Sequence, residues 1–302
     1  GGFQGNLSWI LRLHVTGRMS NDASNKARGS KVLPSIDTRT LFAIVAFGLA
    51  AGSLPAAAAP LRPHQAVYDL SLAGQTEDIL AVEGRIAFTL NARACGDYDL
   101  DYRFAARFHK DGEMTLTDQR TRSTERAHGK EFSFETTTFV DGLDQGAVKG
   151  AAVNASDSTD VTLQEPVSRD FKLPLSRFPL SHTEELITQG RKGTRFFEAR
   201  LFDGDPEAEK LLTTTSVILP VKDGTPAAEG GRTGEELAGL RSWMIDESYF
   251  NSDSDEDGQP VFRARYRLYE NGVSDQMLLD FGAYELKGDL ANLKYLTSPD
   301  CE

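Results

Sequence analysis

The feature that most constrains this chain is an alternation of apolar and polar residues between Val261 and Leu286, interrupted by the dipeptide Asn271-Gly272. A period of two places every second side chain on one face of a β-strand. Asn-Gly tolerates the positive φ angles of a tight turn. A two-residue turn predicts the pairs Glu270–Val273, Arg267–Gln276, Tyr266–Met277, Ala264–Leu279, Arg263–Asp280 and Phe262–Phe281. The sequence therefore predicts an antiparallel hairpin with one apolar and one solvated face.

The same period recurs along most of the chain. Further strands are expected at 66–72, 79–90, 98–108, 114–126, 132–140, 145–153, 158–164, 167–173, 194–203, 210–221, 240–250 and 284–295. The segment 114–126 is polar on both faces, which is typical of a solvated or edge strand. About 12–14 short strands with regular turns predict an all-β fold: a sandwich, a barrel or a single, strongly curled antiparallel sheet.

One short helix interrupts the strand pattern. Residues 181–190 are expected to form it, with Ser181 as N-cap, Glu184 at the third helical position and Gly190 ending it. The stretch 223–239 is rich in Gly, Ala and Glu and lacks periodicity, so we expect a long exposed loop there.

The N-terminal region has the pattern of an export signal. Residues 1–18 lack organised periodicity, and Met19 is a plausible start. Basic residues follow, then the apolar run Leu41–Leu54 and the small residues Ala56-Ala57-Ala58. This order predicts a signal peptide at 19–58, cleaved after Ala58, and one exported domain at 59–302 without a transmembrane segment. An uncleaved anchor is the alternative.

Composition argues against some classes of binding partner. The 302 residues carry a formal charge of −12. The first 59 contribute six Lys/Arg and two Asp/Glu, so the remainder carries −16. An acidic protein repels phosphates, which argues against nucleic acid and anionic membrane surfaces as partners. The 39% hydrophobic residues, with 17 Phe, are sufficient to fill a core.

The two cysteines, Cys95 and Cys301, both lie in the expected exported part. In an oxidising compartment such a pair is a candidate disulfide rather than a metal or redox site. The bond would fasten the C-terminal tail to the end of the second strand.

Site motifs give little support for catalysis. Asp253, Asp255 and Asp257 match the first positions of a calcium loop, but its last ligand position falls on Ala264. We expect a solvated acidic turn there, with weak calcium binding as the alternative. His182 is too close in sequence to Glu184 and Glu185 for a helical metal site. His64, His109 and His128 are expected at the surface rather than as metal ligands. No catalytic residue, metal or cofactor is predicted.

Several stretches together resemble a known family: PHQAVYDLSL at 63–72, LTDQRT at 116–121, GKEFSFETTTFVDG at 129–142, FPLSHTEELI at 178–187 and RLYENGVSDQMLLDFG at 267–282. With the late Cys301, they resemble the alphaproteobacterial cell-envelope integrity protein B family. The resemblance implies a periplasmic β-spiral of about fourteen strands, an incomplete barrel similar to lipoprotein carriers, with one disulfide. It also implies a role in envelope integrity and a functional connection with a periplasmic tetratricopeptide-repeat protein.

Two functions follow as hypotheses. The first is a non-enzymatic protein whose concave sheet face binds a lipid, a lipoprotein or a hydrophobic peptide. The candidate lining residues are Tyr98, Tyr102, Phe104, Phe108, Phe262, Tyr266, Met277, Leu279 and Phe281, unless they form a filled core. The alternative is an envelope hydrolase acting on glycan or lipid, which requires acids and bases that converge in a cleft.

Overall fold

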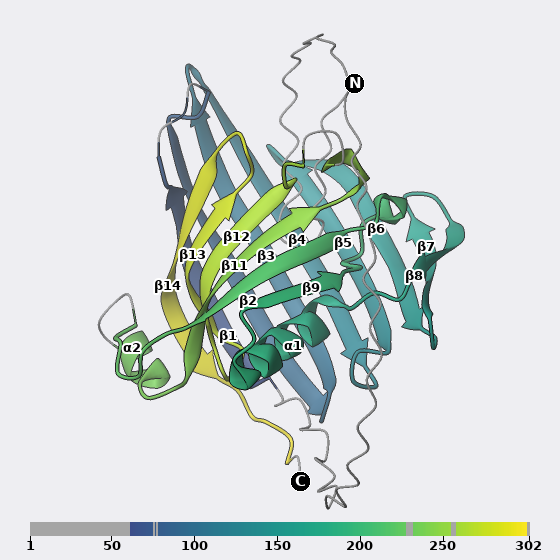
Figure 1. The fold of residues 1–302 in the computed structure, drawn as a ribbon. Coiled ribbons are helices and arrows are strands. Elements are labelled where there is room, and N and C mark those ends of the chain that lie inside the picture. The colour runs from purple at the N-terminus through teal and green to yellow at the C-terminus, as the bar shows by residue number, and fades with distance from the viewer. Residues whose placement is uncertain (1–60, 75, 77, 228–231, 255–257, 301–302) are drawn as a thin grey trace, which may run out of the picture. The chain divides into compact units, whose positions relative to one another are not determined.

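The computed structural model describes residues 61–300, apart from 75, 77, 228–231 and 255–257. The expected upstream stretch at 1–18, the expected signal peptide at 19–58 and Cys301 lie outside the described residues. In the described part, fourteen strands form one antiparallel sheet (Figure 1). The predicted all-β, curled single sheet is thereby confirmed.

The elements have the following bounds. The strands are β1 (His64–Leu72), β2 (Ala81–Ala94), β3 (Asp97–Lys110), β4 (Glu113–Arg126), β5 (Glu131–Val140), β6 (Leu143–Asn154), β7 (Ser158–Glu165), β8 (Arg169–Pro174), β9 (Phe196–Arg200), β10 (Thr213–Pro220), β11 (Ser242–Phe250), β12 (Phe262–Tyr269), β13 (Ser274–Asp280) and β14 (Glu285–Tyr295). The helices are α1 (Pro179–Lys192) and α2 (Arg232–Leu237), with short 3-10 turns η1 (Ala208–Lys210) and η2 (Ser252–Ser254).

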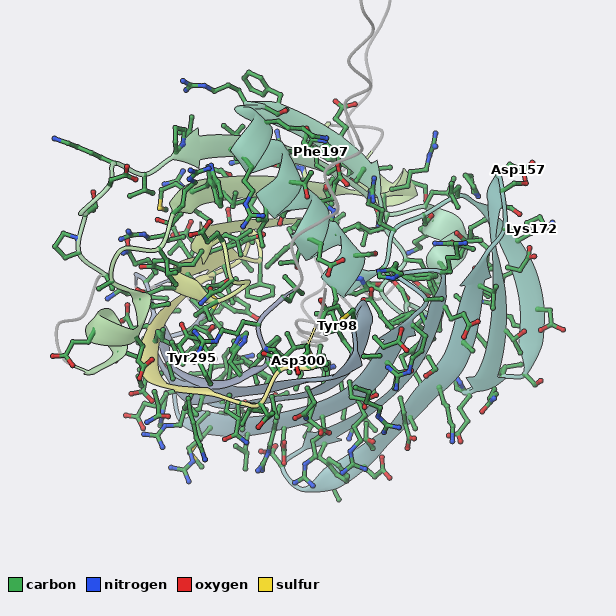
Figure 2. All side chains as sticks on the ribbon, turned by 90° about the horizontal axis from the view of Figure 1, so that it is seen from below. Tyr98, Asp157, Lys172, Phe197, Tyr295 and Asp300 are labelled. Atoms are coloured by element: carbon green, nitrogen blue, oxygen red, sulfur yellow. The ribbon has the colours of Figure 1, made fainter. Side chains whose placement is uncertain are left out.

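The strand order places the first and last strands side by side in the middle of the sheet. From one end to the other it runs β8-β7-β6-β5-β4-β3-β2-β1-β14-β13-β12-β11-β10-β9. The two ends meet near one parallel bridge between Arg177 and Leu201. There the Arg177 N–H donates to the Arg200 carbonyl at 2.8 Å and the Phe202 N–H to the Arg177 carbonyl at 2.9 Å. The sheet therefore curls into a nearly closed wall, with α1 across its opening (Figure 2).

Inward-facing side chains form two apolar clusters. The larger one contains α1 residues and side chains from β1–β3 and β10–β14. The smaller one is built around four phenylalanine rings; Phe132 stacks on Phe178 with centroids 5.1 Å apart, and Phe134 and Phe202 pack beside them. Alternating burial along the strands produces this interior, as the period of two predicts.

Strand β4 corrects one prediction. It is neither an edge strand nor solvated on both faces, because it pairs with β3 on one side and β5 on the other. Its inward side chains are polar yet buried: Thr117, Gln119, Thr121, Ser123 and Glu125. Cross-strand hydrogen bonds satisfy part of this row, such as the 2.9 Å contact between Thr121 and Thr136. Composition alone could not reveal that a polar row faces inward.

The predicted helix is present but longer, and its cap was wrong. Phe178 is the N-cap, Ser181 is the third helical residue, and its hydroxyl oxygen accepts from the Phe178 N–H at 3.1 Å. Gly190 lies inside the helix, which ends at Gly193 with a φ of +78°. Pro179 at the first helical position suits the fixed φ of proline, a signal that indicates the true start.

The hairpin register is correct near the strand ends and wrong near the turn. Arg263 pairs with Asp280 and Ala264 with Leu279, as predicted. The register then shifts, so that Arg267 pairs with Asp275 instead of Gln276. The Tyr269 N–H donates to the Val273 carbonyl at 2.9 Å, which leaves a three-residue loop and places Val273 opposite Tyr269 rather than Glu270. A three-residue loop therefore replaces the expected two-residue turn. A β-bulge between Arg265 and Arg267 accounts for the different register on its two sides.

The segment 223–239 is not a simple exposed loop. It contains α2, and it covers the outer end of β12, where Arg267 is buried rather than solvated. The Arg267 guanidinium donates to the carbonyls of Pro226 at 2.6 Å and Thr225 at 3.0 Å. Backbone carbonyls thus hold this buried cation, an arrangement that side-chain periodicity does not encode.

Candidate functional site

A cavity of about 130 Å³ lies between α1 and the inner face of the sheet. Most of its walls are aliphatic or aromatic side chains from β1, β2, β12 and β13, while Pro179, Leu180 and His182 of α1 cover it. Four of the nine predicted lining residues contact it: Tyr102, Tyr266, Met277 and Leu279. The other five, Tyr98, Phe104, Phe108, Phe262 and Phe281, pack in the core around it. Contact of these residues with a ligand stays a prediction.

One wall of the cavity is polar and centres on Glu247. This residue occupies an inward position of β11, between the buried Ile245 and Tyr249, so strand alternation points its carboxylate at the interior. Four groups donate to it: His182 Nε2 at 2.8 Å, Ser216 Oγ at 2.9 Å, Tyr249 Oη at 3.1 Å and Tyr266 Oη at 2.6 Å. Such a set of donors stabilises an ionised carboxylate.

The charge state of Glu247 follows from these partners. Burial by itself raises the pKa of a carboxyl, and Glu247 is 1% exposed. The charge and hydrogen bond of His182, together with hydrogen bonds from Tyr266 and Ser216, outweigh burial and lower the pKa of Glu247 below its ordinary value. Glu247, at the centre of the polar wall, is therefore an ionised carboxylate that already accepts four hydrogen bonds from the protein.

The trio of Ser216, His182 and Glu247 differs from a nucleophilic triad. In a triad the histidine lies between the serine and the acid and takes the proton of the serine. Here the serine and the histidine both donate to the same carboxylate. The second ring nitrogen of His182, Nδ1, is buried without a hydrogen-bond partner. This geometry fastens α1 to the wall of the sheet.

A second buried carboxylate, Glu125, holds the first turn of α1. Its two oxygens accept the backbone N–H groups of Leu180 at 2.6 Å and Ser181 at 3.0 Å. Free N–H groups at a helix N-terminus favour such an acceptor. Burial nevertheless dominates and, with the nearby Glu184, raises the pKa of Glu125 to about 8. Glu125 is thus a tertiary cap that comes from a strand 55 residues away in the sequence.

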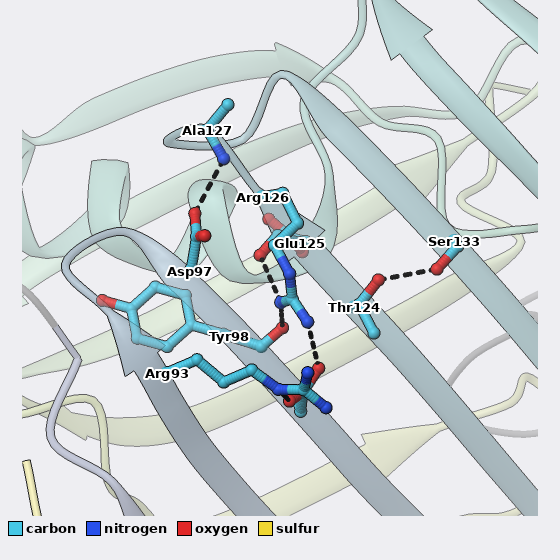
Figure 3. Close-up of polar contacts among 9 residues, drawn as sticks. Arg93, Asp97, Tyr98, Thr124, Glu125, Arg126, Ala127 and Ser133 are labelled. Carbon is cyan, nitrogen blue, oxygen red and sulfur yellow. Dashed lines mark hydrogen bonds and ion pairs between the residues drawn. The ribbon is translucent and has the colours of Figure 1, made fainter.

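The outer face of β3 and β4 fixes the position of Glu125 (Figure 3). The Arg126 guanidinium donates to the Tyr98 carbonyl at 2.6 Å and to Asp99 at 2.5 Å, and Arg93 also pairs with Asp99. The Asp97 carboxylate accepts the Ala127 N–H at 2.8 Å. These contacts join the start of β3 to the end of β4. Tyr98 and Glu125, which lie on the inward face of these two strands, are therefore held at fixed positions.

Tyr98 links three elements rather than lining the cavity. Its hydroxyl accepts the N–H of Leu61 at 2.9 Å and donates to Glu184 of α1 at 2.8 Å. Burial and the Glu184 charge raise the pKa of Tyr98 strongly, so it remains a neutral phenol. His64, expected at the surface, is buried in the cavity wall and stacks on Phe88 with centroids 5.2 Å apart. Burial lowers the pKa of His64.

The remaining predicted residues have separate outcomes. Asp255 and Asp257 lie outside the described residues, as does the side chain of Asp253, so the acidic turn stays a prediction. Within the described ranges, no three His, Cys, Asp or Glu residues are grouped to hold a metal ion. Cys301 is also outside them, and its disulfide stays a prediction. Cys95 Sγ lies 3.8 Å from the carbonyl oxygen of Asp300, the neighbour of Cys301 in the sequence.

Sequence reasoning missed Glu247, Ser216 and Glu125. A signal was present for Glu247, because the alternation Trp243, Ile245, Glu247, Tyr249 puts a carboxylate in an otherwise apolar row. The sequence held no such signal for Glu125, because β4 is polar at every position from Thr117 to Arg126. Over the described residues, no helix is both long and apolar enough to span a bilayer.

Comparisons with known proteins agree with this architecture. The model of a family described as EipB-like matches residues 55–297. A protein of Brucella abortus (strain 2308) named "Cell envelope integrity protein EipB" is 32% identical over 249 residues, covering 82% of this chain and 88% of that protein. A crystal structure of a β-barrel-like protein of unknown function, DUF1849 from Brucella abortus, superposes with a TM-score of 0.72 at 32% identity. It covers 79% of this chain and 99% of that one.

Proposed function

This chain belongs to the EipB-like family, and we propose that it maintains the cell envelope as a non-enzymatic periplasmic protein that holds an apolar group in the cavity under α1. The name of the Brucella relative supports the envelope role. The expected signal peptide supports the periplasmic location. The largely apolar cavity is the observation that carries the binding part of the proposal.

The volume of the cavity limits its occupant. Pockets that take a whole drug-sized ligand span roughly 300–1,000 Å³, and the cavity measures about 130 Å³. An engineered apolar cavity of about 150 Å³ takes up benzene. The cavity therefore suits one ring or the end of a chain rather than a complete acyl chain. Among lipids, lipoproteins and hydrophobic peptides, it fits the terminal part of an acyl chain or one bulky side chain.

The polar wall supports binding over catalysis. Glu247 accepts four hydrogen bonds, so it lacks a free position from which to take a proton from a substrate. Among the described residues, the hydrogen-bond partner of the Ser216 hydroxyl is this same carboxylate. An envelope hydrolase remains the competing function, and the experiments below discriminate the two. Association with a periplasmic tetratricopeptide-repeat protein is likewise part of the proposal.

A cavity-filling variant tests the role in the cell. Ala264 is buried in the cavity wall, and Ala105 lies on an outward position of β3. In a strain that lacks this protein, Ala264→Leu should restore survival in detergent poorly, whereas Ala105→Leu should restore it as wild type does. Equal rescue by both variants, at equal protein levels, would show that the cavity has no part in envelope maintenance.

Extraction of the purified protein tests the binding. Protein taken from the periplasm should release a stoichiometric apolar compound into organic solvent, and Ala264→Leu protein should release much less. Chemical change of an added envelope lipid or glycan, abolished by Glu247→Gln, would instead establish the hydrolase.

A further inference from the structure

The three residues that precede β1, Leu61, Arg62 and Pro63, form a strap along the cavity. Leu61 is 3% exposed, and its side chain is part of the cavity wall. It packs against Gly272, in the loop between β12 and β13. A Cβ atom at position 272 would come within 2.8 Å of Leu61 Cδ2, and the φ of Gly272 is +88°. The loop therefore requires glycine both for its backbone and to accommodate Leu61.

The strap is fastened by contacts outside the sheet ladder. The Leu61 N–H donates to Tyr98 Oη at 2.9 Å, and the Arg62 N–H donates to the Asn271 carbonyl at 2.9 Å. The Arg62 guanidinium lies 3.5 Å from the ring centroid of Tyr295. None of these contacts belongs to the strand pairing of β1 with β2 or β14. Pro63 differs, because its carbonyl accepts the Leu296 N–H at 2.9 Å, next to the paired ends of β1 and β14. Leu61 and Arg62 can therefore open locally while the sheet stays intact.

The same anchor connects the strap to the helix. Tyr98 Oη accepts from Leu61 and donates to Glu184, so the strap and α1, which both bound the cavity, share one hydroxyl. An apolar group that replaces the Leu61 side chain would keep the cavity walls in apolar contact. The cost of displacement is then the exposure of the Leu61 side chain itself and the loss of the polar contacts of the strap.

We propose that Leu61 sets the size of the apolar group that the cavity accepts, and that a longer group enters by displacing the strap. This inference rests on the proposed binding function of the cavity. Leu61 is a specificity-determining residue in this scheme. Wild-type protein binds short apolar groups with the strap in place. Removal of the Leu61 side chain extends the cavity toward Gly272.

A homologous series of linear alcohols provides the test. Calorimetric titration of the exported protein compares wild type, Leu61→Ala and Leu70→Ala. Leu70 is equally buried in the core, in β1, but does not line the cavity. Affinity for wild type should rise with chain length and then fall. For Leu61→Ala the maximum should move a few carbons longer, with about 10- to 100-fold tighter binding of the longer alcohols.

The outcomes separate this inference from the function on which it rests. Identical length limits for wild type and Leu61→Ala, or an equal shift for Leu70→Ala, would overturn the role of Leu61 alone. Absence of binding of any alcohol to every protein would overturn the binding function itself.

A second variant covers the case in which Leu61→Ala fails to fold. Tyr98→Phe removes the hydroxyl that holds the strap and keeps the Leu61 side chain. It should tighten binding of the longest alcohol several-fold and leave the shortest unchanged. No change for either alcohol would contradict displacement of the strap.

Discussion

At the scale of single residues, the pKa values of two buried carboxylates shift in opposite directions. Both shifts follow from one balance, between the desolvation of the charged form and the hydrogen-bond donors around it. Glu247 has four donors, and His182 is among them, so its pKa falls despite burial. Glu125 has two backbone donors and an acidic neighbour, Glu184, so burial prevails and its pKa rises to about 8. The number and charge of partners, rather than burial alone, decide the ionisation.

The Glu247 network predicts a large loss of stability on truncation. Glu247→Ala leaves His182, Ser216, Tyr249 and Tyr266 without their shared acceptor, and we expect a decrease of about 3–5 kcal/mol in the free energy of unfolding. Urea titration followed by circular dichroism measures it. Glu198→Ala, at an exposed position of β9, is the control and should change stability by less than about 0.5 kcal/mol. A small effect for both would mean that the network contributes little.

Glu125 predicts a pH dependence with a defined sign. Its pKa is about 8 in the folded protein against an ordinary value of 4.5, so the folded state retains a proton that the unfolded state releases. Stability from this group is present below pH 4.5 and is lost as the pH rises toward 8, with an upper bound of about 5 kcal/mol.

Glu125→Gln removes this titration and keeps a side-chain acceptor for the Leu180 or Ser181 N–H. Urea midpoints of the variant should therefore vary less than those of wild type between pH 5 and pH 8. Glu131→Gln, at the exposed start of β5, should retain the wild-type slope. A slope that survives in Glu125→Gln would assign the pH dependence to other groups.

At the scale of elements, α1 depends on close contact with the sheet. Gly190 lies inside the helix against the ring of Trp243, and an added Cβ would come within 2.6 Å of that ring. Helix propensity favours alanine over glycine by about 1 kcal/mol, whereas overpacking a core costs about 1–3 kcal/mol. The contact, not propensity, therefore explains a glycine at this position.

Gly190→Ala should consequently lower the melting temperature, by about 2–4 °C for each kcal/mol lost. Trp243 is the sole tryptophan downstream of the expected cleavage site, so its fluorescence reports the docking of α1. Lys192→Ala, at an exposed position of the same helix, is the control. An unchanged melting temperature and emission spectrum for Gly190→Ala would show that α1 shifts at little cost.

Elements were predictable to different degrees for physical reasons. Long strands with clean alternation, such as β3, are specified by their own sequence because burial of one face requires that pattern. The bulge between Arg265 and Arg267 and the inward polar row of β4 depend on neighbouring strands, about which local periodicity holds no information. The acceptor for the Leu180 and Ser181 N–H groups of α1 is Glu125 in β4, which no local sequence motif could reveal.

The candidate site was predictable only as a region. Tyr102, Tyr266, Met277 and Leu279 follow from inward alternation, and they do line the cavity. Its polar wall combines Glu247 of β11 with His182 of α1, two residues 65 positions apart. Their meeting depends on the helix folding back across the sheet opening, which a strand pattern cannot encode.

At the scale of the whole molecule, the tail is held near an early strand. Cys95 Sγ approaches the Asp300 carbonyl, which supports the expected bond from Cys95 to Cys301. A cross-link that spans about 200 residues restricts the unfolded chain by roughly 5 kcal/mol in the chain-entropy model.

Cys95→Ser and Cys301→Ser should each lower the melting temperature and increase cleavage by protease under oxidising conditions. Wild-type protein treated with a reductant should behave as the variants do. Equal melting temperatures for oxidised and reduced wild type would refute a stabilising disulfide.

The strand order has a consequence for how such a molecule is made. Strands β1 and β14, the earliest and the latest to emerge, are neighbours at the centre of the sheet. Until β14 is in place, β1 and β13 are edge strands with unpaired backbone N–H and C=O groups. Unpaired edge strands favour association between chains. A truncation of a few C-terminal residues in β14 would therefore split the sheet at its middle rather than trim its periphery.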